Sequence, residues 1–139
     1  MNRLPIATFL EPRPSDVTWT HVIYALHGFG VVLGVATSAL IVTSFLFSLP
    51  SIVAVVMNYV RRGQVRGTFL ESHFRWQIRT FWYALLWLVL ASLISLPLML
   101  VLVGFLTLWV AVVAVGLWVL YRVGRGWMRL AARRPMYTE

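Results

Sequence analysis

Two long stretches without a charged side chain constrain this sequence more than any other feature. No Asp, Glu, Lys or Arg occurs at residues 21–60 or at residues 80–121. One helix that crosses the hydrocarbon core of a bilayer needs ~20 apolar residues, so each stretch has room for about two such helices. The pattern predicts an all-α, polytopic membrane protein built from two helical hairpins.

The composition predicts that lipid covers most of this chain. Hydrophobic side chains make up 60% of its 139 residues, and its mean hydropathy is +0.83. A soluble domain of this size cannot bury so much apolar surface. We expect one transmembrane domain at 20–131, preceded by a polar lead at 1–19 and followed by a basic tail at 132–139. The absence of cysteine excludes disulfides and thiolate chemistry.

All twelve basic residues are arginines, and most of them fall in two clusters, at 61–79 and 122–134. Positive charge beside membrane helices marks the cytoplasmic side, and the planar guanidinium group binds phosphate well. A GC-rich genome is a second explanation for arginine in place of lysine. The charges therefore predict contact with anionic lipid headgroups, and we expect no nucleic-acid partner. The arginines expected at the headgroups are Arg61, Arg62, Arg66, Arg75, Arg79, Arg122, Arg125 and Arg129.

The two basic clusters also predict how the stretches are divided into helices. Clusters on the same side require an even number of crossings between them, so we expect helices near 69–96 and 98–130, with a turn at 95–97. Pro50 is typical of a first helical turn and divides the other stretch unequally. This predicts a long helix near 20–47 and a short one near 50–62.

The short helix leaves the number of crossings open. Its apolar part is ~17 Å long, less than the ~30 Å hydrocarbon core. Either it is a short span sheltered by its neighbours, with the N-terminus in the cytoplasm, or it is interfacial or re-entrant, with the N-terminus outside. Similar aromatic, arginine and glycine residues at 59–63 and 121–126 favour the first alternative.

The central segment predicts an amphipathic helix at the membrane interface that continues into the third membrane helix. Thr68 followed by Glu71 is typical of a capping box, which predicts that this helix starts near Phe69. Glu71 lies four residues before Arg75 on a charged face, while apolar residues recur at helical spacing on another. We expect the arginines among phosphates and the aromatic rings at headgroup level.

A third face of this helix carries His73, Trp76, Gln77 and Thr80. One interpretation is that these side chains only anchor and orient the helix. The other is that they contact a partner, a headgroup or a substrate. We therefore treat them as a candidate partner or substrate face.

Most of the sequence takes part in a resemblance to a known family. The residues that carry it are those at 21–27, 50–54, 58–60, 66–83, 121–123 and 126–127. With them the chain resembles a family of small bacterial inner-membrane proteins of unknown function, itself distantly similar to the Tic-type import component of the chloroplast inner envelope. The resemblance implies a helical fold with four spans and no established activity, and we do not transfer a channel function from it.

Small residues at four-residue spacing predict close packing between helices. Gly30, Gly34 and Ser38 share one face of the first helix, and Ala91 and Ser95 form a shorter version on the third. Such faces let two helices approach closely. We expect them to pack inside the chain, with a homo-oligomer or partner-subunit contact as the alternative.

The histidines do not predict a metal or haem site. His21 and His27 are six residues apart, about 240° around a helix, so they cannot bind one ion from one face. No acidic residue lies in either uncharged stretch. We expect no metal and no cofactor, with His21 at the membrane boundary and His27 hydrogen-bonded to a neighbouring helix.

Ion-coupled transport and catalysis need an ionisable or nucleophilic group at the place of reaction. The two uncharged stretches, which form the membrane-embedded parts of the predicted helices, contain Asn58 and several hydroxyl groups but no Asp, Glu, Lys or Arg. We therefore assign no catalytic residue and expect a protein that is not an enzyme.

The function predicted from the sequence is that of an accessory, assembly or scaffolding subunit in the bacterial inner membrane. We expect a cytoplasmic C-terminus and N-terminus, contacts with partner helices in a larger complex, and contacts with anionic lipid. The alternative is a homo-oligomer that forms a translocation element or passive channel for a solute or polypeptide.

Overall fold

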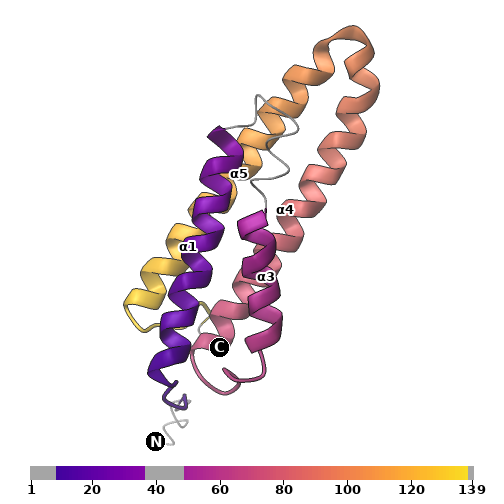
Figure 1. Ribbon diagram of the computed structural model, residues 1–139. Helices are drawn as coiled ribbons and strands as arrows, with labels where there is room; N and C mark the ends of the chain where they lie inside the picture. The colour runs from indigo at the N-terminus through magenta and orange to yellow at the C-terminus, as the bar shows by residue number, and fades with distance from the viewer. Residues whose placement is uncertain (1–8, 37–48, 138–139) are drawn as a thin grey trace, which may run out of the picture.

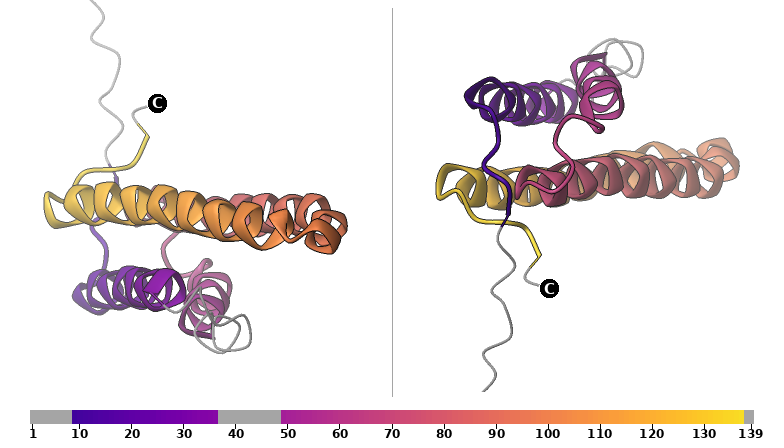
Figure 2. Two further views of the ribbon diagram at one scale, coloured as in Figure 1. Left: turned by 90° about the horizontal axis from the view of Figure 1, so that it is seen from above. Right: turned by 90° about the horizontal axis from the view of Figure 1, so that it is seen from below.

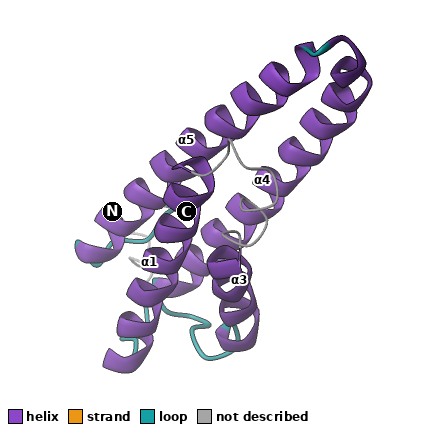
Figure 3. Ribbon diagram, turned by 45° about the horizontal axis from the view of Figure 1, so that its top comes forward, coloured by secondary structure: helices purple, strands orange, loops and turns teal. Residues whose placement is uncertain are grey.

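The computed structural model describes residues 9–36 and 49–137. These residues form four α-helices and no strand: α1 Pro14–Ala36, α3 Leu49–Arg61, α4 Leu70–Leu98 and α5 Val103–Ala131 (Figures 1 and 3). A short 3-10 helix, η1 Met99–Val101, joins α4 to α5. The prediction of an all-α fold with a short second helix and a third helix that continues from the central segment is confirmed.

The helices pack in two layers, as Figure 2 shows. α4 and α5 form one layer, and α1 and α3 form the other. α1 is antiparallel to α5, because Tyr24 lies against Gly126 while Val35 lies against Gly116. α1 is antiparallel to α3 as well, so each layer is a pair of antiparallel helices.

Both ends of the described chain lie at the same end of the molecule as the loop at 62–69. The amide of Leu10 donates a hydrogen bond of 3.0 Å to the carbonyl of Gly67. The carboxylate of Glu11 pairs with Arg133 at 3.1 Å. The segment before α1 is therefore held against the rest of the protein, on the same side as the C-terminal tail.

α1 begins at Pro14, so the expected start at residue 20 is wrong. The fixed φ of proline suits a first helical turn, where its missing N–H has no intrahelical partner in any case. Asp16 also lies in the first turn, where a negative charge interacts favourably with the helix dipole. The expected end of this helix at residue 47 lies outside the described residues.

α4 begins at Leu70, close to the predicted start, but the predicted capping box is wrong. The hydroxyl of Thr68 donates to the carbonyl of Val65 at 2.7 Å instead of accepting from the helix. The carboxylate of Glu71 accepts from the amide of Gly67 at 2.9 Å. Gly67 has a φ of +75°, and this turn displaces the amide that Glu71 reaches by one residue.

The hairpin between α4 and α5 turns at 99–102, so the predicted turn at 95–97 is wrong. α4 continues past Pro97 to Leu98, and Leu102 then takes a left-handed conformation with a φ of 62°. Proline removes one backbone hydrogen bond and is tolerated in membrane helices. Here it lies in the last turn of α4, where few further bonds depend on it.

α1, α4 and α5 are long and apolar enough to cross a membrane, so the chain is a multi-pass membrane protein. α3 has 13 residues and is about 20 Å long, shorter than the ~30 Å core. The uncharged parts of α4 and α5, at 80–98 and 103–121, are each about 28 Å long. Their length matches the thickness of the hydrocarbon core, so Thr80 and Arg122 mark one boundary between the hydrocarbon core and the headgroups.

The buried apolar core lies beside the charged residues. It includes Ile23, Tyr24, Leu70, Phe74 and Leu130, each with at most 1% of its surface exposed. The other half of the α4–α5 hairpin projects beyond the described parts of α1 and α3 and presents large apolar side chains outward (Figure 1). One half of the molecule thus packs like a soluble protein, and the other half suits contact with lipid.

The predicted small-residue contacts are formed only in part. Gly30 packs against Ser51 of α3, whereas a Cβ on Gly34 would meet nothing within 4 Å. Ser95 is buried and its hydroxyl lies 3.0 Å from that of Thr107, so α4 contacts α5 there. Ala91 on the same face is partly buried. Ser38 lies outside the described residues.

Two glycines of α5 that the sequence analysis did not single out allow closer approaches. A Cβ on Gly104 would collide with backbone atoms of Ser95, Leu98 and Met99. A Cβ on Gly116 would collide with Val35 of α1. The absence of a side chain at these positions therefore sets how closely α5 packs against its neighbours.

Gly104→Ala should lower the free energy of unfolding by about 1–3 kcal/mol, because backbone atoms cannot move aside for the new methyl group. Gly124→Ala, in the same helix with open space around it, is the matched control and should be neutral or slightly stabilising. Thermal unfolding in detergent micelles, followed by circular dichroism, measures both changes. Equal midpoints for the two variants would contradict the close contact at Gly104.

Candidate functional site

All charged side chains of the described residues lie at one end of the molecule. We call residues 9–27, 54–79 and 122–137 the basic end. The predicted headgroup arginines divide by exposure. Arg62, Arg66, Arg75, Arg79 and Arg125 are exposed, and Arg61, Arg122 and Arg129 are half-buried.

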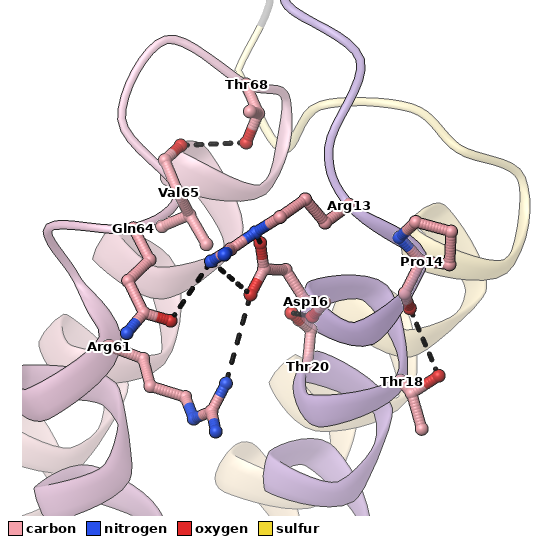
Figure 4. A network of polar contacts seen from close by, with 9 residues as sticks. All are labelled: Arg13, Pro14, Asp16, Thr18, Thr20, Arg61, Gln64, Val65 and Thr68. Carbon is pink, nitrogen blue, oxygen red and sulfur yellow. Dashed lines mark hydrogen bonds and ion pairs between the residues drawn. The ribbon is translucent and has the colours of Figure 1, made fainter.

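A buried carboxylate joins α1 to the end of α3. Only 3% of Asp16 is exposed, and its carboxylate accepts from Arg13 Nε at 2.9 Å and lies 3.8 Å from Arg61. Arg13 also donates to Gln64 at 3.4 Å (Figure 4). The guanidinium of Arg61 stacks over the ring of Trp19, 4.2 Å from its centroid. These contacts hold α1 against the end of α3 and the loop at 62–69.

His73 connects α1 with the C-terminal tail. Its Nε2 lies 2.8 Å from the carbonyl of Arg134, and its Nδ1 lies 2.9 Å from the hydroxyl of Tyr24. A carbonyl only accepts, so Nε2 carries the hydrogen, and in the neutral ring Nδ1 accepts from Tyr24. His73 is fully buried and its two nitrogens are both used.

Further contacts fix the tail on α4. The amide of Met136 donates to Ser72 at 3.0 Å, and Met136 itself is buried. Arg129 donates to the carbonyl of Pro135 at 3.1 Å. The tail at 132–137 therefore covers the start of α4.

Arg122 is held between aromatic rings at the membrane boundary. Its guanidinium lies 3.6 Å from the ring centroid of Trp76 and 5.0 Å from that of Trp118. Its Nε donates to the hydroxyl of Thr80 at 2.7 Å, and Trp76 Nε1 donates to the carbonyl of Arg122 at 3.2 Å. Arg125 lies above the same Trp76 ring at 5.9 Å.

Two more indole groups form hydrogen bonds near this boundary. Trp127 Nε1 donates to His21 Nδ1 at 3.0 Å, and Trp82 Nε1 donates to the hydroxyl of Tyr59 at 2.9 Å. Tryptophan and tyrosine are typical of the membrane–water interface, where one end of the ring is apolar and the other is wet. His21 thus takes part in the aromatic belt of the basic end.

Three buried polar side chains make no hydrogen bond among the described residues: His27 through Nε2, and Asn58 and Gln77 through both amide atoms. His27 was expected to form a hydrogen bond with a neighbouring helix, but its Nε2 atom forms none with the described residues. A cavity of about 10 Å³, the size of one water molecule, is lined by His27, Gln77, Tyr24, Trp76, Thr80 and Val123.

The candidate partner face turns into the protein. His73, Gln77 and Thr80 are at most 5% exposed, and Trp76 is partly buried beneath Arg122. The four side chains therefore contact α1, α5 and the tail of their own chain. Two residues that sequence reasoning missed, Asp16 and Tyr24, are central to the same region. The arginine three residues before Asp16 was a usable signal for a local ion pair.

No protein family, curated protein or solved structure matches this chain. The resemblance to the small inner-membrane family therefore stays a prediction. The site has to be interpreted from its own geometry. The chemistry it presents is anion binding by guanidinium groups that aromatic rings and hydrogen bonds hold in place.

Asp16→Asn should lower the free energy of unfolding by about 1–3 kcal/mol, because it removes the buried charge that two arginines share. Glu11→Gln is the matched control: Glu11 is exposed, and its pair with Arg133 should contribute less than about 1 kcal/mol. Chemical unfolding in micelles measures both. If Glu11→Gln lowered the free energy of unfolding as much as Asp16→Asn, the larger contribution assigned to Asp16 would be contradicted.

His73→Phe should release the tail, because it removes both hydrogen bonds while nearly keeping the ring volume. We expect the amide of Met136 to exchange with solvent about tenfold faster, the effect of losing roughly 1–2 kcal/mol of local stability. Hydrogen exchange read by NMR or mass spectrometry measures this rate. Tyr24→Phe keeps the bond to Arg134 and should change the rate much less, and equal rates in both variants would contradict the role of His73.

Proposed function

We propose that this chain is a non-enzymatic protein of the bacterial inner membrane that serves as an accessory, assembly or scaffolding subunit. Its basic end faces the cytoplasm and contacts anionic headgroups. The outer surface of the α4–α5 hairpin contacts helices of a partner protein.

The observation that carries the proposal is the position of Trp87 and Trp109. Each ring is about half exposed on the hairpin, and neither indole N–H has an acceptor among the described residues. Trp87 lies about 10 Å beyond Thr80 along α4, and Trp109 lies about 9 Å from the turn at 99–102, so both are within the hydrocarbon core. An N–H without an acceptor is costly there, and a partner helix can supply one.

The arrangement of the arginines supports the orientation. Positive charge collects on the cytoplasmic side of membrane proteins, and the basic end carries all eleven arginines at 13–134. Both described chain ends lie at this end, which agrees with a cytoplasmic N-terminus and C-terminus. The exposed apolar half of the hairpin then spans the bilayer away from the charges.

Site-specific photo-crosslinking in intact bacterial membranes tests the proposal. A benzophenone amino acid placed at Trp87 or Trp109 should give one discrete adduct with a partner polypeptide. Leu100, which is 89% exposed in the turn between the helices, is the control position and should give lipid adducts or none.

The adducts separate the alternatives. An adduct of twice the mass of this chain, together with a defined homo-oligomer after gentle solubilisation, would favour the oligomeric translocation element, which flux in proteoliposomes then tests. Lipid adducts alone at both tryptophans would contradict the partner contact.

A further inference from the structure

Arg122 presents an unusually well-fixed cation at the surface of the protein. Its Nε is bonded to Thr80, and Thr80 in turn donates to the carbonyl of Trp76 at 2.8 Å. The ring of Trp76 lies under the guanidinium plane, and that of Trp118 lies near it. These contacts fix the side chain but leave its two terminal NH₂ groups without a hydrogen bond to any described residue.

No acidic side chain of the described residues offsets this charge. All three pair with other arginines: Asp16 with Arg13 and Arg61, Glu71 with Arg75, and Glu11 with Arg133. The guanidinium of Arg125 lies 5.9 Å from the centroid of the same Trp76 ring on which Arg122 stacks, so two like charges lie near one ring. Such a pair is unfavourable by itself and is stabilised by an anion that both can contact.

The depth of the pair identifies the source of the anion. Arg122 is the first charged residue after the ~28 Å uncharged part of α5, which places it at the level of the lipid phosphates. Leu117 and Tyr121, on the membrane side of Arg122, are each about 60% exposed and offer apolar surface to an acyl chain. A phosphate on a lipid satisfies both features, whereas a free phosphate satisfies only the first.

We propose that Arg122, stacked on Trp76, and the nearby Arg125 form a specific binding site for the phosphate of an anionic phospholipid. The flat guanidinium fork of Arg122 binds two phosphate oxygens, and Arg125 supplies the second charge. This inference rests on the proposed orientation of the basic end and turns general headgroup contact into one defined site between α4 and α5.

Native mass spectrometry of the full chain, titrated with dioleoyl-phosphatidylglycerol in detergent, tests the site. Arg122→Gln should weaken the first lipid bound by about tenfold or more, since it removes a charged double hydrogen bond. Arg122→Lys keeps the charge but removes the planar guanidinium group, so it should weaken the first lipid bound nearly as much. Arg125 is exposed and makes no hydrogen bond to a described residue, so Arg125→Gln should keep the fold and still reduce lipid binding.

The matched control is Arg66→Gln, which removes the same charge from the exposed loop at 62–69 and should leave the first lipid unchanged. Phosphatidylcholine should bind weakly to every variant. Millimolar inorganic phosphate should not displace the lipid. Displacement by phosphate would instead indicate a site for the free ion.

Three results would overturn the site. One is an equal loss of phosphatidylglycerol affinity in Arg66→Gln and Arg122→Gln, and another is equal affinity for phosphatidylcholine and phosphatidylglycerol. The third is unchanged phosphatidylglycerol affinity in all variants of Arg122 and Arg125. Circular dichroism confirms that each variant is folded. The adducts expected at Trp87 and Trp109 do not depend on Arg122. The lipid site and the partner contact can therefore fail separately.

Discussion

Placing a charged side chain in the hydrocarbon core costs free energy, and the described part of the chain is accordingly divided into a charged half and an apolar half. Within residues 9–36 and 49–137, every ion pair and most side-chain hydrogen bonds between helices lie at the basic end. Beyond Thr80 and Arg122, towards the turn at 99–102, the contacts of the α4–α5 hairpin with other described residues are mostly apolar. The exceptions are the hydrogen bond from Trp82 to Tyr59, the pair of hydroxyl groups at Ser95 and Thr107, and the close backbone approach at Gly104. The position of the charges thus decides which kind of packing each part of a helix can use.

The basic end is specified by directional contacts. Asp16 holds α1 to α3, His73 holds α1 to the tail, and Arg122 holds α4 to α5. Each of these groups would be costly if left unpaired in a buried position, so together they select one arrangement of the helices over other compact ones. The apolar half has few such contacts, because for an apolar side chain lipid is as good a neighbour as another helix.

The sequence predicted the helices well, because charge gaps and Pro50 are local signals with a clear physical cause. Pro97 misled the prediction of the turn, since a proline in the last turn of a membrane helix costs only one hydrogen bond. Asp16 was assigned to a polar lead because its contact with Arg61, which is distant in sequence, cannot be inferred from spacing. The candidate face at His73 was found as a pattern, but its inward direction depends on Tyr24 and the tail, which are distant in sequence.

The docking of the tail has a consequence for how the protein is made. Arg134 and Met136 follow α5 in the sequence, yet they bond to His73 and Ser72 at the start of α4. The α4–α5 hairpin must therefore be inserted and closed before these bonds can form. The tail docks after the hairpin has closed, and it then completes the contacts of the basic end.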